Sequence, residues 1–301
     1  MALYTDEYKR LVVDDIKSFE GLNHPVRAGI AERLIRRNAK TSSLHPNPDD
    51  EFADPKIGPN YEIVANYVRS IKRALDYDEK PFEDPIYVEK MSTGGLMILN
   101  GHHRWMAAVR IGCSRLPVKI VNVTSAESIR DTLRRSERKY CVSFDLDEVL
   151  LTDGNIYPAD RNLVFPFNLL YKKTLRKNAV FLVKELQKAG FDVWIYTGNF
   201  YSEEYIRLLF RLHRAKVDGI VNGLSKRKNT GLKKEFTGKY EYSLHIDNGE
   251  LVCVNTAAKE FSTVEISSDP GSWASEAMKA VRGLGFWESE PASDKNNGSE
   301  E

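Results

Sequence analysis

The chain lacks several features that would place it in a specialised class. Only three of its 301 residues are cysteines, and Cys113, Cys141 and Cys253 are too widely spaced to form a metal-binding pair. Cys113 and Cys141 lie in or beside apolar runs, which favours buried, reduced thiols. No apolar run approaches the roughly 20 residues that span a bilayer, and the N-terminus lacks the basic and then apolar order of a secretion signal. We therefore expect a cytoplasmic protein with no membrane partner.

A large net charge is also absent. The 44 Lys and Arg residues nearly balance the 43 Asp and Glu residues, which leaves a formal charge of +1. Such a chain has no global field that attracts nucleic acid or anionic membrane, although a local basic patch stays possible. A hydrophobic content of 42% and a charged content of 29% are typical of a soluble globular protein. The length is sufficient for two domains, each with its own core.

The first half of the chain carries a mixed pattern of strands and helices. Apolar periodicity predicts strands at 8–16, 85–89, 96–99 and 116–123, and helices at 24–40, 61–75, 102–111 and 125–138. A loop rich in Pro and Asp separates the first two predicted helices. The charge-rich stretch Arg135–Lys139 marks the predicted boundary, with a first domain at 1–136, a second at 137–287 and a polar tail at 288–301 that we expect to be disordered.

The second half alternates more regularly. The pattern predicts strands at 140–144, 193–196, 219–221 and 242–246, with helices at 179–189 and 203–212 between them. Strands that alternate with helices indicate a Rossmann-like parallel sheet covered by helices, so the chain belongs to the α/β class. In such sheets the ligand site lies at the C-terminal ends of the strands.

Polar residues follow three of these predicted strands. The first ends at Asp145-Leu146-Asp147, the second at Thr197, and the third at Asp247-Asn248. Two carboxylates so close together repel each other unless a cation lies between them. This arrangement suits a phosphoryl transfer assisted by Mg²⁺, in which one Asp attacks phosphorus and the other handles the proton of the leaving group.

The order of these three motifs resembles the haloacid dehalogenase-like superfamily over residues 139–270. The resemblance implies that Asp145 is the nucleophile that forms an aspartyl-phosphate. It implies that Asp147 acts as general acid and then as general base, and that Thr197 hydrogen-bonds the phosphoryl oxygens. Preorganised donors of this kind are usually a large part of catalysis. The same fold without turnover, which binds phosphate only, is the alternative.

The same resemblance implies a magnesium site. Its ligands would be the carboxylates of Asp145 and Asp247 and the carbonyl of Leu146. Many members of the superfamily have a second acid where this chain has Asn248. The pair Asp247-Asn248 is similar to that of the phosphatases that act on the RNA polymerase II tail, in which the Asn also coordinates the metal.

A phosphate-binding lysine is expected between Thr197 and Asp247. The candidates are Lys226, Lys228, Lys233 and Lys234. We favour Lys233 as the catalytic lysine because it begins the segment that leads into the last predicted strand. The other three lysines are expected to lie in a loop exposed to solvent. The connection between the first two motifs holds no large domain, which suggests an open site for a bulky substrate. The aromatic stretch at 157–171 either lines that site or packs as core.

The first half contains a second candidate site, Asn100-Gly101-His102-His103-Arg104, between a predicted strand and a predicted helix. Helix N-termini bind anions through free N–H groups and the helix dipole. Gly101 allows the backbone to approach a phosphate closely, and Arg104 has the planar fork that clamps one. The two histidines alternatively serve only to cap and orient the helix.

This region resembles the ParB/sulfiredoxin-like fold over about residues 8–123. Sulfiredoxins carry Cys where this chain has His102, so repair of sulfinic acid is not expected. The sequence Gly-His-His-Arg is most similar to the free-serine kinase branch, in which a loop carboxylate activates the serine hydroxyl. Glu51 is our choice for that carboxylate, beside Asp49 and Asp50 in the corresponding loop. The resemblance implies a nucleotide ligand and leaves ATP, ADP and CTP open.

The sequence as a whole predicts an α+β ParB/sulfiredoxin-like domain followed by a Mg²⁺-dependent phosphatase domain. The expected partners are a nucleotide and a phosphorylated substrate, which is a small molecule, a protein or a nucleic-acid end. Two alternatives remain open. One is a ParB-like regulator that binds nucleic acid with a steep salt dependence, and the other is a sensor of phosphate or nucleotide without catalysis.

Overall fold

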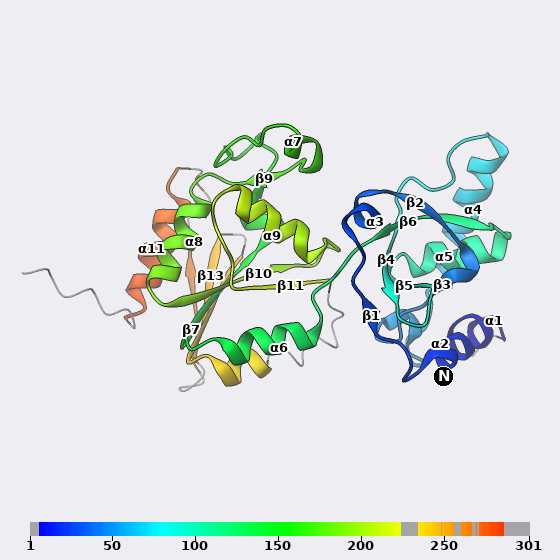
Figure 1. Cartoon of the computed structure of the whole chain (residues 1–301), viewed down its shortest axis with the longest axis horizontal. Coiled ribbons are helices and arrows are strands. Elements are labelled where there is room, and N and C mark those ends of the chain that lie inside the picture. The colour runs from blue at the N-terminus through cyan, green and yellow to red at the C-terminus, as the bar shows by residue number, and fades with distance from the viewer. Residues whose placement is uncertain are drawn as a thin grey trace, which may run out of the picture. The chain divides into compact units, whose positions relative to one another are not determined.

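The structure is a computed structural model that describes residues 6–223, 234–247, 249–255, 260–266, 269 and 271–285 (Figure 1). The chain divides into two compact units. The first comprises Met1–Arg135, Ile195–Leu208 and Gly219–Phe236, and the second comprises Ser136–Trp194, Leu209–Asp218 and Thr237–Glu301. Within the described residues, we find no helix whose length and hydropathy suit a membrane span.

The first unit is built on a mixed sheet with strand order β2-β6-β4-β5-β3, and β1 pairs with β4 beside this path. The strands are β1 (Pro25–Val26), β2 (Arg37–Lys40), β3 (Leu44–His45), β4 (Ile86–Met91), β5 (Leu96–Asn100) and β6 (Arg115–Ile120). Strand β4 runs antiparallel to β5 and parallel to β6. The chain leaves β5 at Asn100 and enters the next helix at once, which places the Gly-His-His-Arg motif at the end of a central strand.

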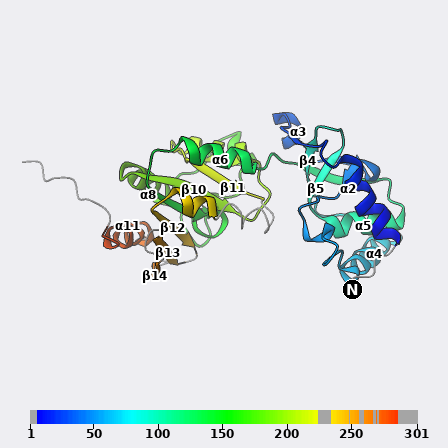
Figure 2. The same ribbon diagram turned by 90° about the horizontal axis from the view of Figure 1, so that it is seen from below.

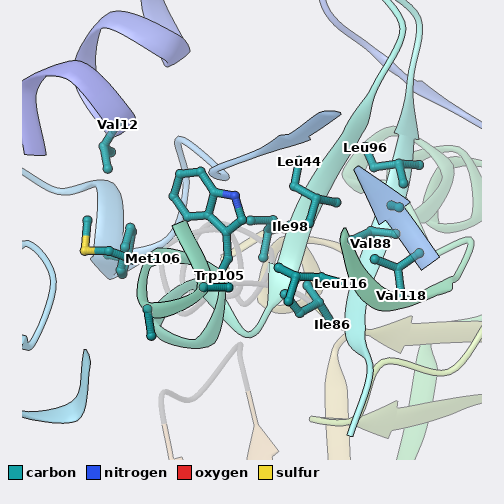
Figure 3. Packing of buried hydrophobic residues seen from close by; sticks show 14 of the residues in the cluster. Val12, Leu44, Ile86, Val88, Leu96, Ile98, Trp105, Met106, Leu116 and Val118 are labelled. Atoms are coloured by element: carbon teal, nitrogen blue, oxygen red, sulfur yellow. The ribbon is translucent and has the colours of Figure 1, made fainter. Parts of the chain in front are cut away.

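Helix α5 (His102–Ile111) packs against β4 of this sheet, and α4 (Tyr61–Asp76) packs against α5 (Figure 2). Both match their predicted ranges. Side chains of β4, β5 and β6 form a buried core with Trp105 and Met106 of α5 (Figure 3). Helix α5 ends at Gly112, whose φ of 83° is the left-handed conformation that favours glycine at this position.

The predicted strand at 8–16 is wrong, because this segment is helical. Helix α1 (Asp6–Tyr8), a π-helical turn at Lys9–Val13 and helix α2 (Asp14–Phe19) follow one another. Tyr8 and Val12 lie four residues apart and are both buried, so they share one face of a helix. The adjacent β-branched residues Val12 and Val13 suggested a strand, but packing against the domain core decides the conformation.

The predicted helix at 24–40 is also largely wrong. Only α3 (Ile30–Leu34) is helical, and it lies between strands β1 and β2. The C-terminal part of the segment, Arg37–Lys40, is strand β2, which pairs with β6. Ile30 and Leu34 have exposed fractions of 70% and 59%. Their helical spacing therefore did not mark a buried face.

The second sheet has the strand order β11-β10-β7-β12-β13-β14. Its strands are β7 (Tyr140–Asp145), β10 (Phe191–Thr197), β11 (Gly219–Asn222), β12 (Tyr242–Asp247), β13 (Glu250–Asn255) and β14 (Glu260–Glu265). The α/β class is confirmed. The predicted strands β7 and β12 are parallel, whereas β13 and β14, which the sequence analysis did not predict, run antiparallel to their neighbours. The hairpin between β12 and β13 was missed because its turn also carries the Asp247 motif.

The described part of the chain also contains further helices and a small hairpin. They are α6 (Ala126–Arg135), α7 (Phe167–Leu170), α8 (Ala179–Lys188), α9 (Glu203–Leu212), α11 (Trp273–Gly283) and the pair β8 (Leu151–Thr152) and β9 (Thr174–Leu175). Helices α8 and α11 lie side by side (Figure 1). Strand β7 is buried along almost its whole length, as expected for an inner strand of an α/β sheet.

Several predictions concern residues outside the described part of the chain. These are the tail at 288–301, the metal ligand Asn248 and the lysines Lys226, Lys228 and Lys233. Lys234 is described and exposed. Of the cysteines, Cys141 and Cys253 are buried and Cys113 is half-buried, and all three are free.

Candidate functional site

The N-terminus of α5 is arranged around Gly101. This residue is the N-cap and adopts a φ of 104°, in the left-handed region. A Cβ at this position would lie 3.1 Å from Ile86 Cγ1 and 3.1 Å from Arg104 Nη2. The first N–H groups of any α-helix have no partner within the helix, so those of His102, His103 and Arg104 begin a surface suited to an anion.

The two histidines hold loops through their ring nitrogens. The backbone N–H of Asn47 donates to His102 Nε2 at 3.2 Å, and that of Asn60 donates to His103 Nε2 at 3.0 Å. A ring nitrogen that accepts a backbone N–H carries no proton, so both imidazoles are neutral in this arrangement. What the two residues offer to an anion is therefore their backbone N–H groups rather than a charged ring.

Burial lowers the pKa of both imidazole rings. His102 is buried, and desolvation lowers the pKa of its imidazole to about 4, against the opposing effect of the Asp50 carboxylate. Desolvation also lowers the pKa of His103, again opposed by Asp50. The ring of Phe52 stacks on His102 at 5.1 Å and meets His103 edge-on at 5.1 Å. Both histidines therefore act as neutral anchors in a partly apolar setting.

A carboxylate close to His102 is that of Asp50, which the sequence analysis named beside Glu51 but did not choose. Its Oδ1 lies 3.7 Å from His102 Nδ1. Asp50 is also the N-cap of the short turn Glu51–Ala53 and accepts from the N–H of Phe52 at 2.9 Å. The predicted carboxylate, Glu51, is exposed on that turn. Its predicted role as the activating base stays a prediction.

Arg104 is fixed beside the same helix end. Its Nη1 donates to the carbonyl of Asp84 at 2.8 Å and its Nη2 to Asn100 Oδ1 at 3.3 Å. The structure thus brings together all five residues of the predicted Asn100–Arg104 site. A guanidinium held next to free N–H groups is a suitable receptor for phosphate oxygens.

The buried His102 predicts a specific dependence of stability on pH. Its folded pKa of about 4 lies below the ordinary 6.5, so the unfolded state takes up the proton first as the pH falls. Stability that is present at pH 7 is therefore lost between about pH 6.5 and pH 4. From pH 7 to pH 5 the loss is about 2 kcal/mol. Thermal unfolding of the wild type and of His102→Gln should show a steeper fall of Tm in the wild type, and parallel curves would contradict this.

The second sheet brings two predicted metal ligands together. Strands β7 and β12 are parallel, with Phe144 opposite Ile246. The next residues, Asp145 and Asp247, therefore end neighbouring strands at the same edge, as the sequence predicts. Asp145 Oδ1 accepts the N–H of Glu148 at 2.7 Å, which starts the turn at Leu146–Leu150.

The electrostatics of this edge favour a cation. Burial raises the pKa of the Asp145 carboxyl, two backbone N–H groups lower it, and the charges of Asp147 and Asp247 raise it further. In the described part of the chain, no three His, Cys, Asp or Glu side chains are close enough to share a metal ion. Mg²⁺ is nevertheless usually held by one or two carboxylates with carbonyls, water and phosphate oxygens. The oxygen donors of Asp145, Asp247 and Leu146 fit that pattern.

The remaining predicted residue of this site, Thr197, ends β10, the neighbour of β7 in the strand order. It is buried, and its Oγ1 accepts the N–H of Asn199 at 3.0 Å. The predicted phosphate-binding lysine, Lys233, lies outside the described residues. The aromatic stretch at 157–171 is partly exposed, with Phe165 at 76%.

Comparison with known proteins identifies a relationship in the first half. Residues 34–136 match the family model described as the ParB N-terminal domain. A ParB-like protein of Sulfolobus acidocaldarius is 32% identical over an alignment of 126 residues, and the match covers 36% of this chain and 60% of the relative. The chain thus spans about 60% of the length of this curated relative. The predicted resemblance to ParB is confirmed at this level, whereas the Gly-His-His-Arg subtype and the phosphatase resemblance stay predictions.

Two solved structures of the chromosome-partitioning protein ParB from Caulobacter crescentus, both truncated at the C-terminus, are also similar. The complex with CTP-γ-S is 25% identical, covers 35% of this chain and 56% of that chain, and has a TM-score of 0.25. The complex with the centromeric parS site is 22% identical, covers 34% and 49%, and has a TM-score of 0.23. TM-scores this low do not establish a shared overall fold.

Proposed function

We propose that the domain containing residues 34–136 binds a nucleotide and holds its phosphate oxygens at the N-terminus of α5. The observation that carries this proposal is the left-handed Gly101, whose missing Cβ leaves room beside Arg104. The match to the ParB N-terminal domain supports it. Neutral His102 and His103 position two loops around the same helix end, and the N–H groups with Arg104 supply the donors.

Calorimetric titration of the full-length chain with ATP, ADP, CTP and sodium triphosphate tests this proposal. We expect at least one nucleotide to bind more tightly than triphosphate, and Arg104→Ala to weaken it by at least about tenfold. The matched control is Arg115→Ala, an exposed arginine of β6 whose Nη1 donates to the carbonyl of Asn38. Equal binding to the wild type and to Arg104→Ala would exclude α5 as the phosphate site.

A ParB-like regulator that binds nucleic acid is the competing interpretation, and the family match favours it as well. Its signature is affinity for duplex DNA that falls linearly with the logarithm of salt concentration, because bound cations are released. The nearly balanced charge of the chain opposes strong binding of this kind. If Arg104→Ala loses its affinity for DNA as well as its affinity for nucleotide, both ligands bind one shared anion site.

We propose a second activity for the other unit, the Mg²⁺-dependent removal of a phosphoryl group. The paired strand ends at Asp145 and Asp247 support it. Mg²⁺ held by Asp145, Asp247 and the Leu146 carbonyl would neutralise the charge of the phosphoryl group. Asp145 attacks phosphorus and forms an aspartyl-phosphate, while Asp147 gives a proton to the leaving oxygen. Asp147 then takes a proton from the water that cleaves the aspartyl-phosphate and releases phosphate.

A further inference from the structure

Three polar side chains of the second unit form a hydrogen-bonded chain that is part of neither site described above. Thr174 Oγ1 lies 2.8 Å from His213 Nε2, and His213 Nδ1 lies 3.2 Å from Asp160 Oδ2. Thr174 is on β9, His213 directly follows α9, and Asp160 lies between β8 and α7. All three residues belong to the second unit. A hydroxyl, an imidazole and a carboxylate in this order have the geometry of a nucleophile, its base and the acid that orients the base.

Backbone hydrogen bonds hold each of the three residues in place. The N–H of Asp160 donates to the carbonyl of Leu175, the residue after Thr174, at 2.8 Å. Thr174 pairs with Thr152 in the hairpin of β8 and β9. The N–H of His213 donates to the carbonyl of Phe210 in the last turn of α9 at 3.1 Å. The side chains therefore project from fixed positions, which a catalytic geometry requires.

The protonation of His213 suits a base. An ionised carboxylate only accepts hydrogen bonds, so Asp160 places the imidazole proton on Nδ1, and Nε2 accepts from the Thr174 hydroxyl. His213 has an exposed fraction of 3%. Burial lowers the pKa of its imidazole, the Asp160 carboxylate opposes this, and the positive charge of Arg161 lowers the pKa further. The ring is therefore neutral near pH 7 and able to take a proton.

The threonine is the member of this chain that lies towards solvent. Thr174 is half-buried, whereas His213 is buried. Arg161 is exposed, and its Nη1 donates to the carbonyl of Leu212, the residue before His213, at 3.0 Å. A positive charge near the base stabilises the oxyanion that forms when a hydroxyl attacks a carbonyl group.

This arrangement determines the class of reaction. We infer that Thr174 is an activated nucleophile that takes the acyl group from a small carboxylic ester. Thr174 Oγ1 attacks the carbonyl carbon, and its proton passes to His213 Nε2. The bond between that carbon and the alcohol oxygen breaks, and His213 gives the proton to the leaving alcohol. Water then cleaves the acyl-threonine by the same route, which releases the carboxylic acid and restores the hydroxyl. Asp160 positions the ring of His213.

A trapping reagent locates the nucleophile in the full-length chain. Diethyl 4-nitrophenyl phosphate reacts with activated hydroxyls by the same attack, loses 4-nitrophenol and leaves a stable diethyl phosphoryl group. Mass spectrometry of peptides should find this group on Thr174. It should be absent from Thr152, whose hydroxyl donates to the carbonyl of Tyr157 and not to a base. Labelling elsewhere with none on Thr174 would overturn the inference, because a merely structural link between β9 and the end of α9 gives that result.

Turnover of 4-nitrophenyl acetate measures the role of the hydroxyl. Thr174→Val keeps the shape and removes the hydroxyl, so we expect kcat/KM to fall at least about 100-fold. Thr174→Ser keeps a hydroxyl and should retain both turnover and labelling. The matched control is Thr263→Val, which removes the hydroxyl of an exposed threonine of β14 and should behave like the wild type. Equal turnover by Thr174→Val and the wild type would contradict the assignment.

Variants of the other two residues separate the base from the group that positions it. His213→Gln should abolish labelling of Thr174 and lower kcat/KM at least about 100-fold. Asp160→Asn should lower kcat with little change in KM, because the carboxylate acts through the histidine and does not touch the ester. Labelling of Thr174 at the wild-type rate in a folded His213→Gln variant would exclude His213 as the base.

Discussion

Replacement of Asp145 by Asn should abolish the Mg²⁺-dependent release of phosphate from an aryl phosphate, with a loss of at least about 1000-fold. The amide is not a nucleophile towards phosphorus, and it also removes one of the two carboxylates proposed to hold Mg²⁺. Its carbonyl oxygen can still accept the N–H of Glu148, the bond that Asp145 accepts at 2.7 Å. The turn after β7 should therefore survive, and phosphate release by the purified variant measures the chemistry rather than the fold.

Asp153→Asn is the matched control for this result. Asp153 is an exposed acid in the following loop and accepts the N–H of Asn155 at 2.9 Å, which an asparagine can also accept. The control removes the same charge and should retain full activity. Equal activity of Asp145→Asn and wild type would exclude Asp145 as nucleophile. Phosphate binding without release in the wild type would instead support the non-catalytic sensor.

Replacement of Gly101 by Ala should remove nucleotide binding at α5 and destabilise the domain by about 1–3 kcal/mol. The left-handed φ of 104° is costly for alanine. The new Cβ would also lie 3.1 Å from both Ile86 Cγ1 and Arg104 Nη2. The guanidinium that is proposed to bind phosphate must therefore shift. Calorimetric titration with the nucleotide that binds the wild type, together with thermal unfolding, measures both effects.

The other end of the same helix supplies the control. Gly112 has a similar left-handed φ of 83°, but a Cβ there would meet open space. Gly112→Ala should therefore cost only about 1 kcal/mol of conformational strain and should bind nucleotide like the wild type. A folded Gly101→Ala variant that binds nucleotide as tightly as Gly112→Ala would show that close approach at Gly101 is not required.

The sequence predicted elements well where periodicity and end signals agreed. Helices α4 and α5 and strands β4, β5 and β7 lie near their predicted ranges. It failed at 8–16 and 24–40, where short apolar repeats fit either period and distant partners decide the outcome. The buried contact of Tyr8 with Ala53, whose carbonyl accepts from the Tyr8 hydroxyl, joins residues 45 positions apart. No local pattern contains that information.

In the candidate sites, too, the sequence predicted what depends on local pattern and missed what depends on contacts between distant residues. Asp145 and Asp247 were predicted because each directly follows an apolar strand, and parallel strands end at one edge of a sheet. The resemblance brought the loop with Asp50 and Glu51 to this site, but the choice fell on Glu51, whereas the carboxylate near the His102 ring is that of Asp50. The local sequence of that loop does not indicate which of its acidic side chains faces the histidine. Both histidines are neutral because the backbone N–H groups of Asn47 and Asn60 donate to their rings. Every residue other than proline has such an N–H group, so the residue types at 47 and 60 could not predict these bonds.

The measurement that most directly tests nucleotide binding at α5 is the change in amide chemical shifts of the isotopically labelled full-length chain on addition of nucleotide. The predicted result is that the backbone amides of His102, His103 and Arg104 shift most, with smaller changes at Asn47 and Asn60 through the two histidine anchors. The same titration of Gly101→Ala should leave these amides unchanged. Saturable binding with its largest shifts elsewhere, and none at residues 101–104, would contradict the proposal.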